Sequence, residues 1–141
     1  MPSRDEAIAV IERLHLAQAS LYTDGDAGPV RAVLTDDIAW HVPGTSPIAG
    51  SYHGVDQVVG YMINRRVLAD GTFRMHRLDV LTGLGSTVAV LTDGSATIAG
   101  VERRWSTVGL YRLAGAQVAE CRLLPFDQAE FDDIWTPRRR D

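Results

Sequence analysis

The chain of 141 residues lacks several features that would suggest a function directly. It has a single cysteine, Cys121, which cannot form an intrachain disulfide and fits a reducing compartment. No apolar run approaches the roughly 20 residues of a membrane span, and the N-terminus has no apolar block of a signal peptide. The formal net charge is −4, whereas binding nucleic acid needs a basic face. We therefore expect a cytoplasmic protein with no membrane and no nucleic-acid partner.

Motifs for bound cofactors are also missing. The glycines of Gly83-Leu84-Gly85 are followed by Val88 rather than a third glycine, so a hairpin turn explains them better than a dinucleotide site. The segment Gly44-Thr45-Ser46-Pro47-Ile48 lacks the second glycine of a nucleophile elbow. Four scattered histidines without a cysteine pair give no zinc spacing. We therefore expect no cofactor and no metal. Because the nucleophile elbow is absent, the sequence also gives little support to covalent catalysis.

The composition is that of an ordinary folded domain, with 45% hydrophobic and 23% charged residues. We expect one domain over residues 1–141, with a flexible tail at 137–141 that contains Arg138-Arg139-Arg140.

The spacing of apolar residues predicts helices first and strands afterwards. A capping box at Ser3 and Glu6 opens a helix from about Arg4 to Tyr22. A short helix at Pro29, a strand over Ile38–Val42, a loop to Gly54 and a helix ending near Gly71 come next. Four long strands are then predicted over residues 73–81, 87–98, 102–113 and 117–124, before a helical turn that begins at Asp127.

This order of elements predicts an α+β fold. Consecutive strands with short connections favour an antiparallel meander. The three helices of the N-terminal half would pack on one side of a strongly curved, mixed or antiparallel sheet and close a cone around an internal pocket.

Several blocks of residues resemble one known family. Trp40-His41-Val42-Pro43-Gly44, Ala49-Gly50-Ser51-Tyr52-His53-Gly54 and Phe126-Asp127-Gln128 are similar to blocks of the SnoaL-like branch of the nuclear transport factor 2-like superfamily. The resemblance implies a cone-shaped fold with a deep, mostly apolar pocket and a homodimer packed through the sheet. It does not imply one activity, because members include isomerases, polyketide cyclases, epoxide hydrolases and non-catalytic binding modules.

Two residues are candidates for proton transfer. His41 has a side chain that titrates near neutrality, although it would have no catalytic role if its strand turns it towards solvent. Asp127 matches the late aspartate that serves as general acid/base in the SnoaL-like cyclases, but it is equally suited to cap the last helical turn. The ketosteroid-isomerase relatives carry an aspartate where this chain has Val42, which argues against that chemistry.

Large side chains suited to a flat hydrophobic ligand form a second group of candidates. Each of them is also suited to an ordinary core position. The substrate-binding candidates are Trp40, Tyr52, Tyr22, Met62, Trp105 and Phe126. The hydroxyl of Tyr52 would steady a developing oxyanion. Arg104 is expected to be exposed on its strand, so no Asp-Arg-Asp set of the epoxide-hydrolase kind is assigned.

The leading functional hypothesis is a cofactor-independent enzyme that acts on a small hydrophobic, oxygenated molecule by general acid/base catalysis. Cyclisation, isomerisation or hydrolysis would fit. The alternatives are a non-catalytic module of the same fold that binds a ligand, or a dimerisation module whose sheet face is the working surface.

Overall fold

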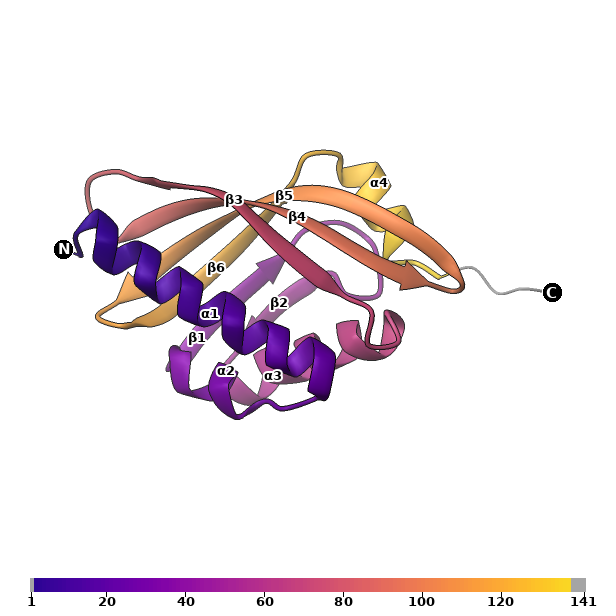
Figure 1. Ribbon diagram of the computed structural model, residues 1–141, viewed down its shortest axis with the longest axis horizontal. Helices are drawn as coiled ribbons and strands as arrows, with labels where there is room; N and C mark the ends of the chain where they lie inside the picture. Colours follow the sequence, from indigo (N-terminus) through magenta and orange to yellow (C-terminus); the bar gives the residue numbers. More distant parts are fainter. Residues whose placement is uncertain (1, 138–141) are drawn as a thin grey trace.

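The computed structural model describes residues 2–137, so Arg138-Arg139-Arg140 and the rest of the predicted tail beyond Pro137 lie outside the described residues (Figure 1). The first half contains α1 (Arg4–Asp24), α2 (Gly28–Val33), β1 (Leu34–Val42), β2 (Gly50–His53) and α3 (Val55–Leu68). The second half contains β3 (Arg74–Thr82), β4 (Thr87–Ile98), β5 (Val101–Ala114), β6 (Gln117–Pro125) and α4 (Gln128–Ile134). The predicted α+β class and the order of elements are confirmed.

Helix α1 begins at the predicted residue, Arg4, and ends at Asp24, two residues beyond the predicted Tyr22. The Ser3 hydroxyl accepts a hydrogen bond from the Glu6 backbone N–H at 3.1 Å, and the Ser3 backbone N–H donates to the Glu6 carboxylate. Gly25 ends the helix in the left-handed conformation, with φ 77°. Leu14 and Leu21 are fully buried, so the apolar face of α1 packs into the core.

The sheet is mixed, with the strand order β2-β1-β6-β5-β4-β3. Strands β3 to β6 form the predicted antiparallel meander, but β1 runs parallel to β6. Strand β2 was predicted to be loop. It pairs with β1 from Val42↔Gly50 to Ala39↔His53 as a four-residue edge strand. Glycine and proline around it hide the alternation that marks longer strands.

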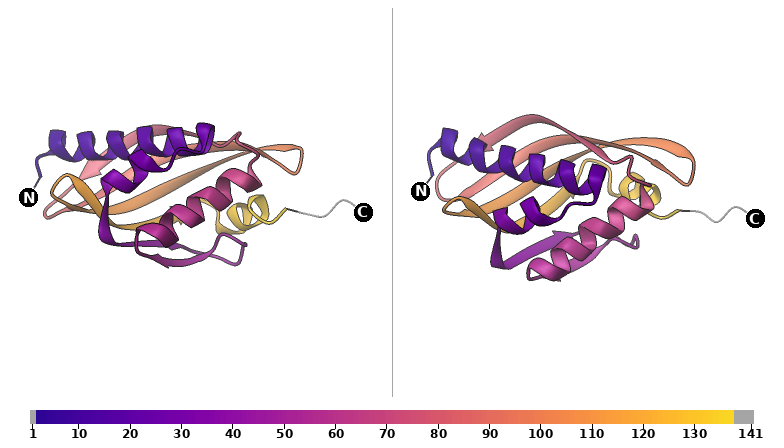
Figure 2. Two further views of the ribbon diagram at one scale, coloured as in Figure 1. Left: turned by 90° about the horizontal axis from the view of Figure 1, so that it is seen from below. Right: turned by 60° about the horizontal axis from the view of Figure 1, so that its bottom comes forward.

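The two faces of the sheet have different surroundings. Helices α1 and α3 lie against the inner face (Figures 1 and 2), where Ile38, Val90 and Val118 are fully buried. On the outer face the alternate residues are half-buried or exposed, as the pattern of β4 illustrates. None of the helices within residues 2–137 combines the length and apolarity needed to cross a membrane.

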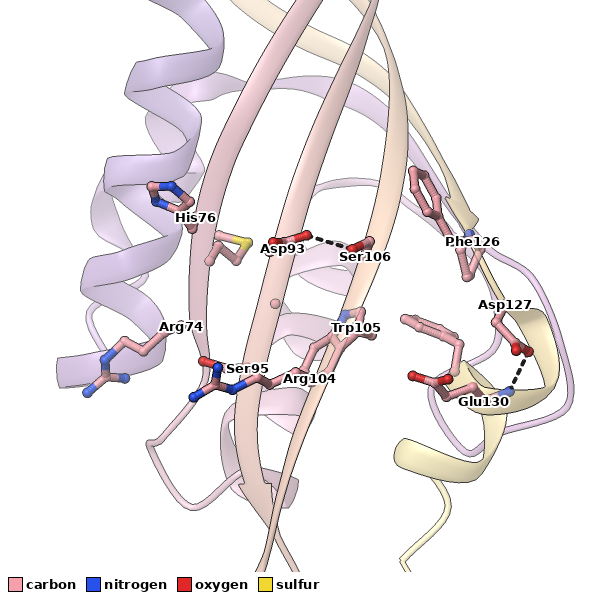
Figure 3. A pocket seen from close by; sticks show the side chains of 14 residues that line it. Arg74, His76, Asp93, Ser95, Arg104, Trp105, Ser106, Phe126, Asp127 and Glu130 are labelled. Carbon is pink, nitrogen blue, oxygen red and sulfur yellow. Dashed lines mark hydrogen bonds between the residues drawn. The ribbon is translucent and has the colours of Figure 1, made fainter.

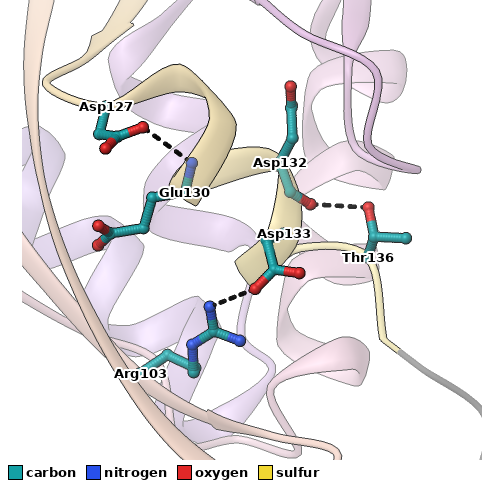
Figure 4. Close-up of polar contacts among 6 residues, drawn as sticks. All are labelled: Arg103, Asp127, Glu130, Asp132, Asp133 and Thr136. Carbon is teal, nitrogen blue, oxygen red and sulfur yellow. Dashed lines mark hydrogen bonds and ion pairs between the residues drawn. The ribbon is translucent and has the colours of Figure 1, made fainter.

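Helix α4 closes one end of the structure. Asp127 is its N-cap, and the Asp127 carboxylate accepts a hydrogen bond from the Glu130 backbone N–H at 3.0 Å (Figure 4). Arg103 of β5 forms an ion pair with Asp133 at 2.8 Å. On the opposite side of α4, Trp135 is buried against α3 and β5. The helix therefore ties the end of the sheet to the interior.

Candidate active site

A buried arginine lies at the centre of the inner face. Arg65 follows Val58 and Met62 along one face of α3, and only 4% of its surface is exposed. Its Nη1 donates a hydrogen bond to the Tyr61 hydroxyl at 2.7 Å. The guanidinium carbon lies 4.4 Å from the centre of the Phe73 ring and 4.7 Å from that of Trp135. Cation–π attraction to these rings offsets part of the cost of burying the charge.

Arg65 has no carboxylate partner within the described part of the chain. The ion pairs there involve other arginines and His41, and Arg65 Nε donates to no acceptor. Guanidinium groups remain charged in proteins, and a buried charge without a counter-charge is strongly destabilising. The site is therefore suited to an anion that the protein chain does not itself supply.

The guanidinium borders an interior cavity of about 30 Å³. This volume has room for about two water molecules. Polar residues reach it from the helices and the sheet: His15 and Gln18 from α1, Arg65 from α3, and Thr92 and Thr107 from β4 and β5. The cavity is polar although the surrounding core is apolar, which is typical of a site with a chemical role.

His15 is the titratable base of this cavity. Burial, with a smaller contribution from the charge of Arg77, lowers the pKa of His15 to about 4. The imidazole is consequently neutral at pH 7 and free to accept a proton. His15 lies on a line along α1 with Ile11, Gln18 and Tyr22, which are all buried.

Three buried phenols surround the same region. Burial raises the pKa values of Tyr22, Tyr61 and Tyr111, so all three keep their protons at neutral pH. Of the three, Tyr111 lines the cavity. The Tyr61 hydroxyl accepts a hydrogen bond from Arg65 and so helps to hold the guanidinium in place.

The structure separates the predicted substrate-binding residues into three groups. Trp40 and Trp105 line the interior cavity. Tyr22 and Met62 are buried in the core. Tyr52 and Phe126 lie elsewhere: the Tyr52 hydroxyl donates to the Ile48 carbonyl at 2.7 Å, and the Phe126 ring is 67% exposed.

Neither of the two predicted acid/base residues lines this cavity, although the hollow beside Asp127 shares part of its wall with it. His41 borders a hollow of about 430 Å³ beside β1, β2 and β6, and its Nδ1 is 2.8 Å from the Ser51 hydroxyl. Asp127 borders another hollow of about 520 Å³, together with Phe126 and the Asp93–Ser106 hydrogen bond (Figure 3). Arg104 also borders that hollow and pairs with Glu102 at 3.0 Å; its side chain is exposed, as predicted.

Sequence reasoning missed His15 and Arg65, although both carry a signal. Arg65 is seven residues after Val58 and three after Met62, so it interrupts the apolar stripe of its helix. His15 is four residues after Ile11 and borders the apolar face of α1. A charged or titratable residue at a core position of an amphipathic helix is the signal that would have found both.

Within residues 2–137, no three side chains of His, Cys, Asp or Glu come together as a group that would hold a metal ion. What the fold provides instead is an enclosed site with one permanent cation, one neutral base and a phenol.

The fold and this site define a helix-covered, curved-sheet protein with a small polar chamber in an aromatic core. Residues 16–121 match the model of the SnoaL-like domain, and the chain belongs to that family, as the resemblance predicted. NTF2-like proteins from Anabaena variabilis and Burkholderia xenovorans share the fold.

Relatives by sequence and by structure agree with this assignment. An uncharacterized protein of Mycobacterium tuberculosis is 26% identical over 114 residues, which cover 81% of this chain and 87% of the relative. Bal32a, from a soil-derived mobile gene cassette, is 20% identical, with 93% of this chain and 97% of that chain covered and a TM-score of 0.82. TerC, co-crystallized with polyporic acid, is 16% identical, with 92% and 97% covered and a TM-score of 0.74.

Proposed function

We propose that this protein is a cofactor-independent enzyme that acts on a small, flat, hydrophobic molecule carrying an acidic oxygen, by general acid/base catalysis in the interior cavity. A carboxylate, an enolate or a phenolate would satisfy the site. The observation that carries the proposal is Arg65, a buried cation that borders the cavity without a carboxylate partner in the described chain. An anionic ligand would supply the missing counter-charge.

The chemical roles follow from the groups that meet at the cavity. His15, neutral at pH 7, accepts a proton from a carbon or hydroxyl of the substrate. Arg65, which is hydrogen-bonded to the Tyr61 hydroxyl, stabilises the negative charge that then develops on the substrate oxygen. Each of these effects contributes about 10²–10³-fold to the rate. Isomerisation and cyclisation through an enolate both use this sequence of steps, and the SnoaL-like family includes enzymes of these types.

The proposal assigns the proton transfer to His15 rather than to His41 or Asp127. His15 borders the same cavity as Arg65, whereas His41 and Asp127 do not line it. Trp40 and Trp105 keep the role predicted from the sequence, because their rings line the cavity and would stack on a flat ligand.

Substrate entry requires the cavity to expand, because ligand pockets usually measure at least 300 Å³. The flexible thioether side chain of Met75 is part of the wall and only partly buried, so it is suited to move aside. TerC, which has this fold and was co-crystallized with polyporic acid, supports an organic acid as the kind of ligand.

Paired ligands would test the charge requirement. Benzoate, cinnamate and 2-naphthoate would be titrated by calorimetry into the wild-type protein, with their methyl esters as neutral controls of similar shape. The acids are expected to bind at least about tenfold more tightly than the esters, and Arg65→Met should remove that difference. Equal affinity for acids and esters would contradict the proposal.

The alternative is a non-catalytic module that binds the same class of ligand. The small volume of the cavity favours it, since the closed site leaves little room for a reacting molecule. Turnover separates the two: a substrate found by screening should lose about 10²-fold or more in rate in His15→Gln while still binding. A module without catalysis would bind the ligand and show no turnover in either protein.

We also propose the homodimer expected from the sequence. On the outer face, the apolar side chain of Leu81 of β3 is 64% exposed. Light scattering should give twice the chain mass for the wild type and the chain mass for Leu81→Lys. A monomeric wild type would rule this assembly out. The cytoplasmic location remains a prediction.

A further inference from the structure

A second group of polar side chains lies on the outer face of the sheet, over three neighbouring strands. Ser51 of β2 lies opposite His41 of β1, and Glu120 of β6 lies opposite Ala39, two residues before His41. The Ser51 hydroxyl is 2.8 Å from His41 Nδ1, and the Glu120 carboxylate is 3.5 Å from His41 Nε2. Each ring nitrogen of His41 thus faces a different partner.

The environment of the ring fixes which nitrogen carries the proton. His41 Nε2 is buried and makes no hydrogen bond, but the Glu120 carboxylate 3.5 Å away favours a proton on that nitrogen. Nδ1 then has a free lone pair, which accepts the hydrogen of the Ser51 hydroxyl. The order hydroxyl, imidazole, carboxylate is that of a nucleophile, its base and the group that orients the base.

The group opens into a hollow of about 430 Å³, which is large enough for a small ligand. Ser51 and His41 form part of its wall, and Pro43 and Leu124 provide apolar surface for an acyl group. Arg122, which lies opposite His41 in the parallel register, brings a positive charge to the same hollow. Arg122 Nε also lies 3.7 Å from the Glu120 carboxylate, so its charge would be shared between Glu120 and an oxyanion formed beside Ser51.

We propose that Ser51, His41 and Glu120 form a second catalytic site, separate from the interior cavity, which hydrolyses carboxylic esters with a small apolar acyl group. Ser51 Oγ bonds to the ester carbonyl carbon while its proton passes to His41 Nδ1. The ester C–O bond then breaks, and His41 returns the proton to the departing alcohol. Water attacks the acyl-serine in the same way, which releases the carboxylic acid and restores Ser51.

The outer face supplies a matched control in Ser106. The Ser106 hydroxyl donates directly to the Asp93 carboxylate at 2.6 Å, with no imidazole between them. A carboxylate alone is a weak base for a serine hydroxyl, so Ser106 should be inert although it lies on the same face.

The experiment treats the full-length protein with a fluorophosphonate, which reacts with activated serines, and locates the adduct by mass spectrometry. We expect an adduct on Ser51 and none on Ser106. Hydrolysis of p-nitrophenyl acetate should fall by about 10²-fold or more in Ser51→Ala and in His41→Gln, and stay unchanged in Ser106→Ala. An unlabelled Ser51, or hydrolysis that persists in Ser51→Ala, would overturn the proposal.

Glu120 acts through His41. Its substitution therefore needs a measurement that a change in packing alone would leave unchanged. Glu120→Gln keeps the size of the side chain and removes its charge, so kcat for p-nitrophenyl acetate should fall while KM and the circular dichroism spectrum stay those of the wild type. An unchanged kcat would remove Glu120 from the site. This readout also serves if His41→Gln fails to fold.

Discussion

The interior cavity and the outer-face group of Ser51, His41 and Glu120 differ in whether their polar side chains have partners within the protein. In the interior, Arg65 is buried among aromatic rings, and no carboxylate of residues 2–137 pairs with it. On the outer face, His41 has a hydroxyl on one side and a carboxylate on the other. The first arrangement is incomplete without a ligand, whereas in the second the Ser51 hydroxyl and the His41 ring are already hydrogen-bonded to each other. A buried permanent cation thus indicates binding, and a hydroxyl hydrogen-bonded to an imidazole indicates proton transfer.

Removing the buried cation should stabilise the protein. Arg65→Met replaces an uncompensated charge by an apolar side chain of similar length, so we expect the free energy of unfolding to rise by about 1–3 kcal/mol. Urea denaturation measures it, and Arg65→Lys, which keeps a charge, is the matched control. A destabilised Arg65→Met protein would mean that Arg65 is part of the structural core rather than a binding group.

His15 should make stability depend on pH. The imidazole binds a proton near pH 6.5 in the unfolded chain but only near pH 4 in the folded one. Between these values the unfolded state binds more protons, so stability should fall by about 3 kcal/mol as the pH drops from 6.5 to 4.

His15→Gln should remove this part of the pH dependence. Urea denaturation midpoints of the wild type and of His15→Gln would be measured from pH 6.5 to pH 4. The difference between the two midpoints at each pH isolates His15, because the carboxylates titrate equally in both proteins. Parallel curves would show that His15 is accessible to protons in the folded state.

The smallest effect concerns Asp127, which the sequence offered both as an acid and as a cap. Asp127→Ala should cost about 1 kcal/mol, because the Glu130 backbone N–H loses its acceptor. Asp127→Ser keeps a capping oxygen without an acidic proton, so its stability and its activity should both equal those of the wild type. If Asp127→Ser were stable but inactive, Asp127 would have a role in proton transfer after all.

The sequence was most informative where local rules decide the structure. Ser3 and Glu6, Gly25 and the long alternation of β4 are short-range signals, and the structure agrees with them. Strand β2 escaped detection because only four residues pair, and Gly50 is one of them. The parallel pairing of β1 with β6 joins segments about 80 residues apart, and no local pattern encodes it.

The candidate sites follow the same division. Trp40 and Trp105 were expected in a pocket because of their size, and both line the interior cavity. His15 and Arg65 were not predicted, because the apolar residues around them on α1 and α3 are typical of an ordinary core-facing helix. The group of Ser51, His41 and Glu120 exists only once three strands have assembled, because the resemblance to serine hydrolases lies in space and not in a motif.

The aromatic surroundings of Arg65 have a practical consequence for observing this molecule. The chain has three tryptophans, and all three lie at the site: Trp40 and Trp105 line the cavity, while Trp135 faces the guanidinium at 4.7 Å and lies 5.4 Å from Trp105. Intrinsic fluorescence therefore carries no contribution from a distant indole. An aromatic acid that enters the cavity should quench or shift nearly the whole emission, so the protein reports its own occupancy without a label.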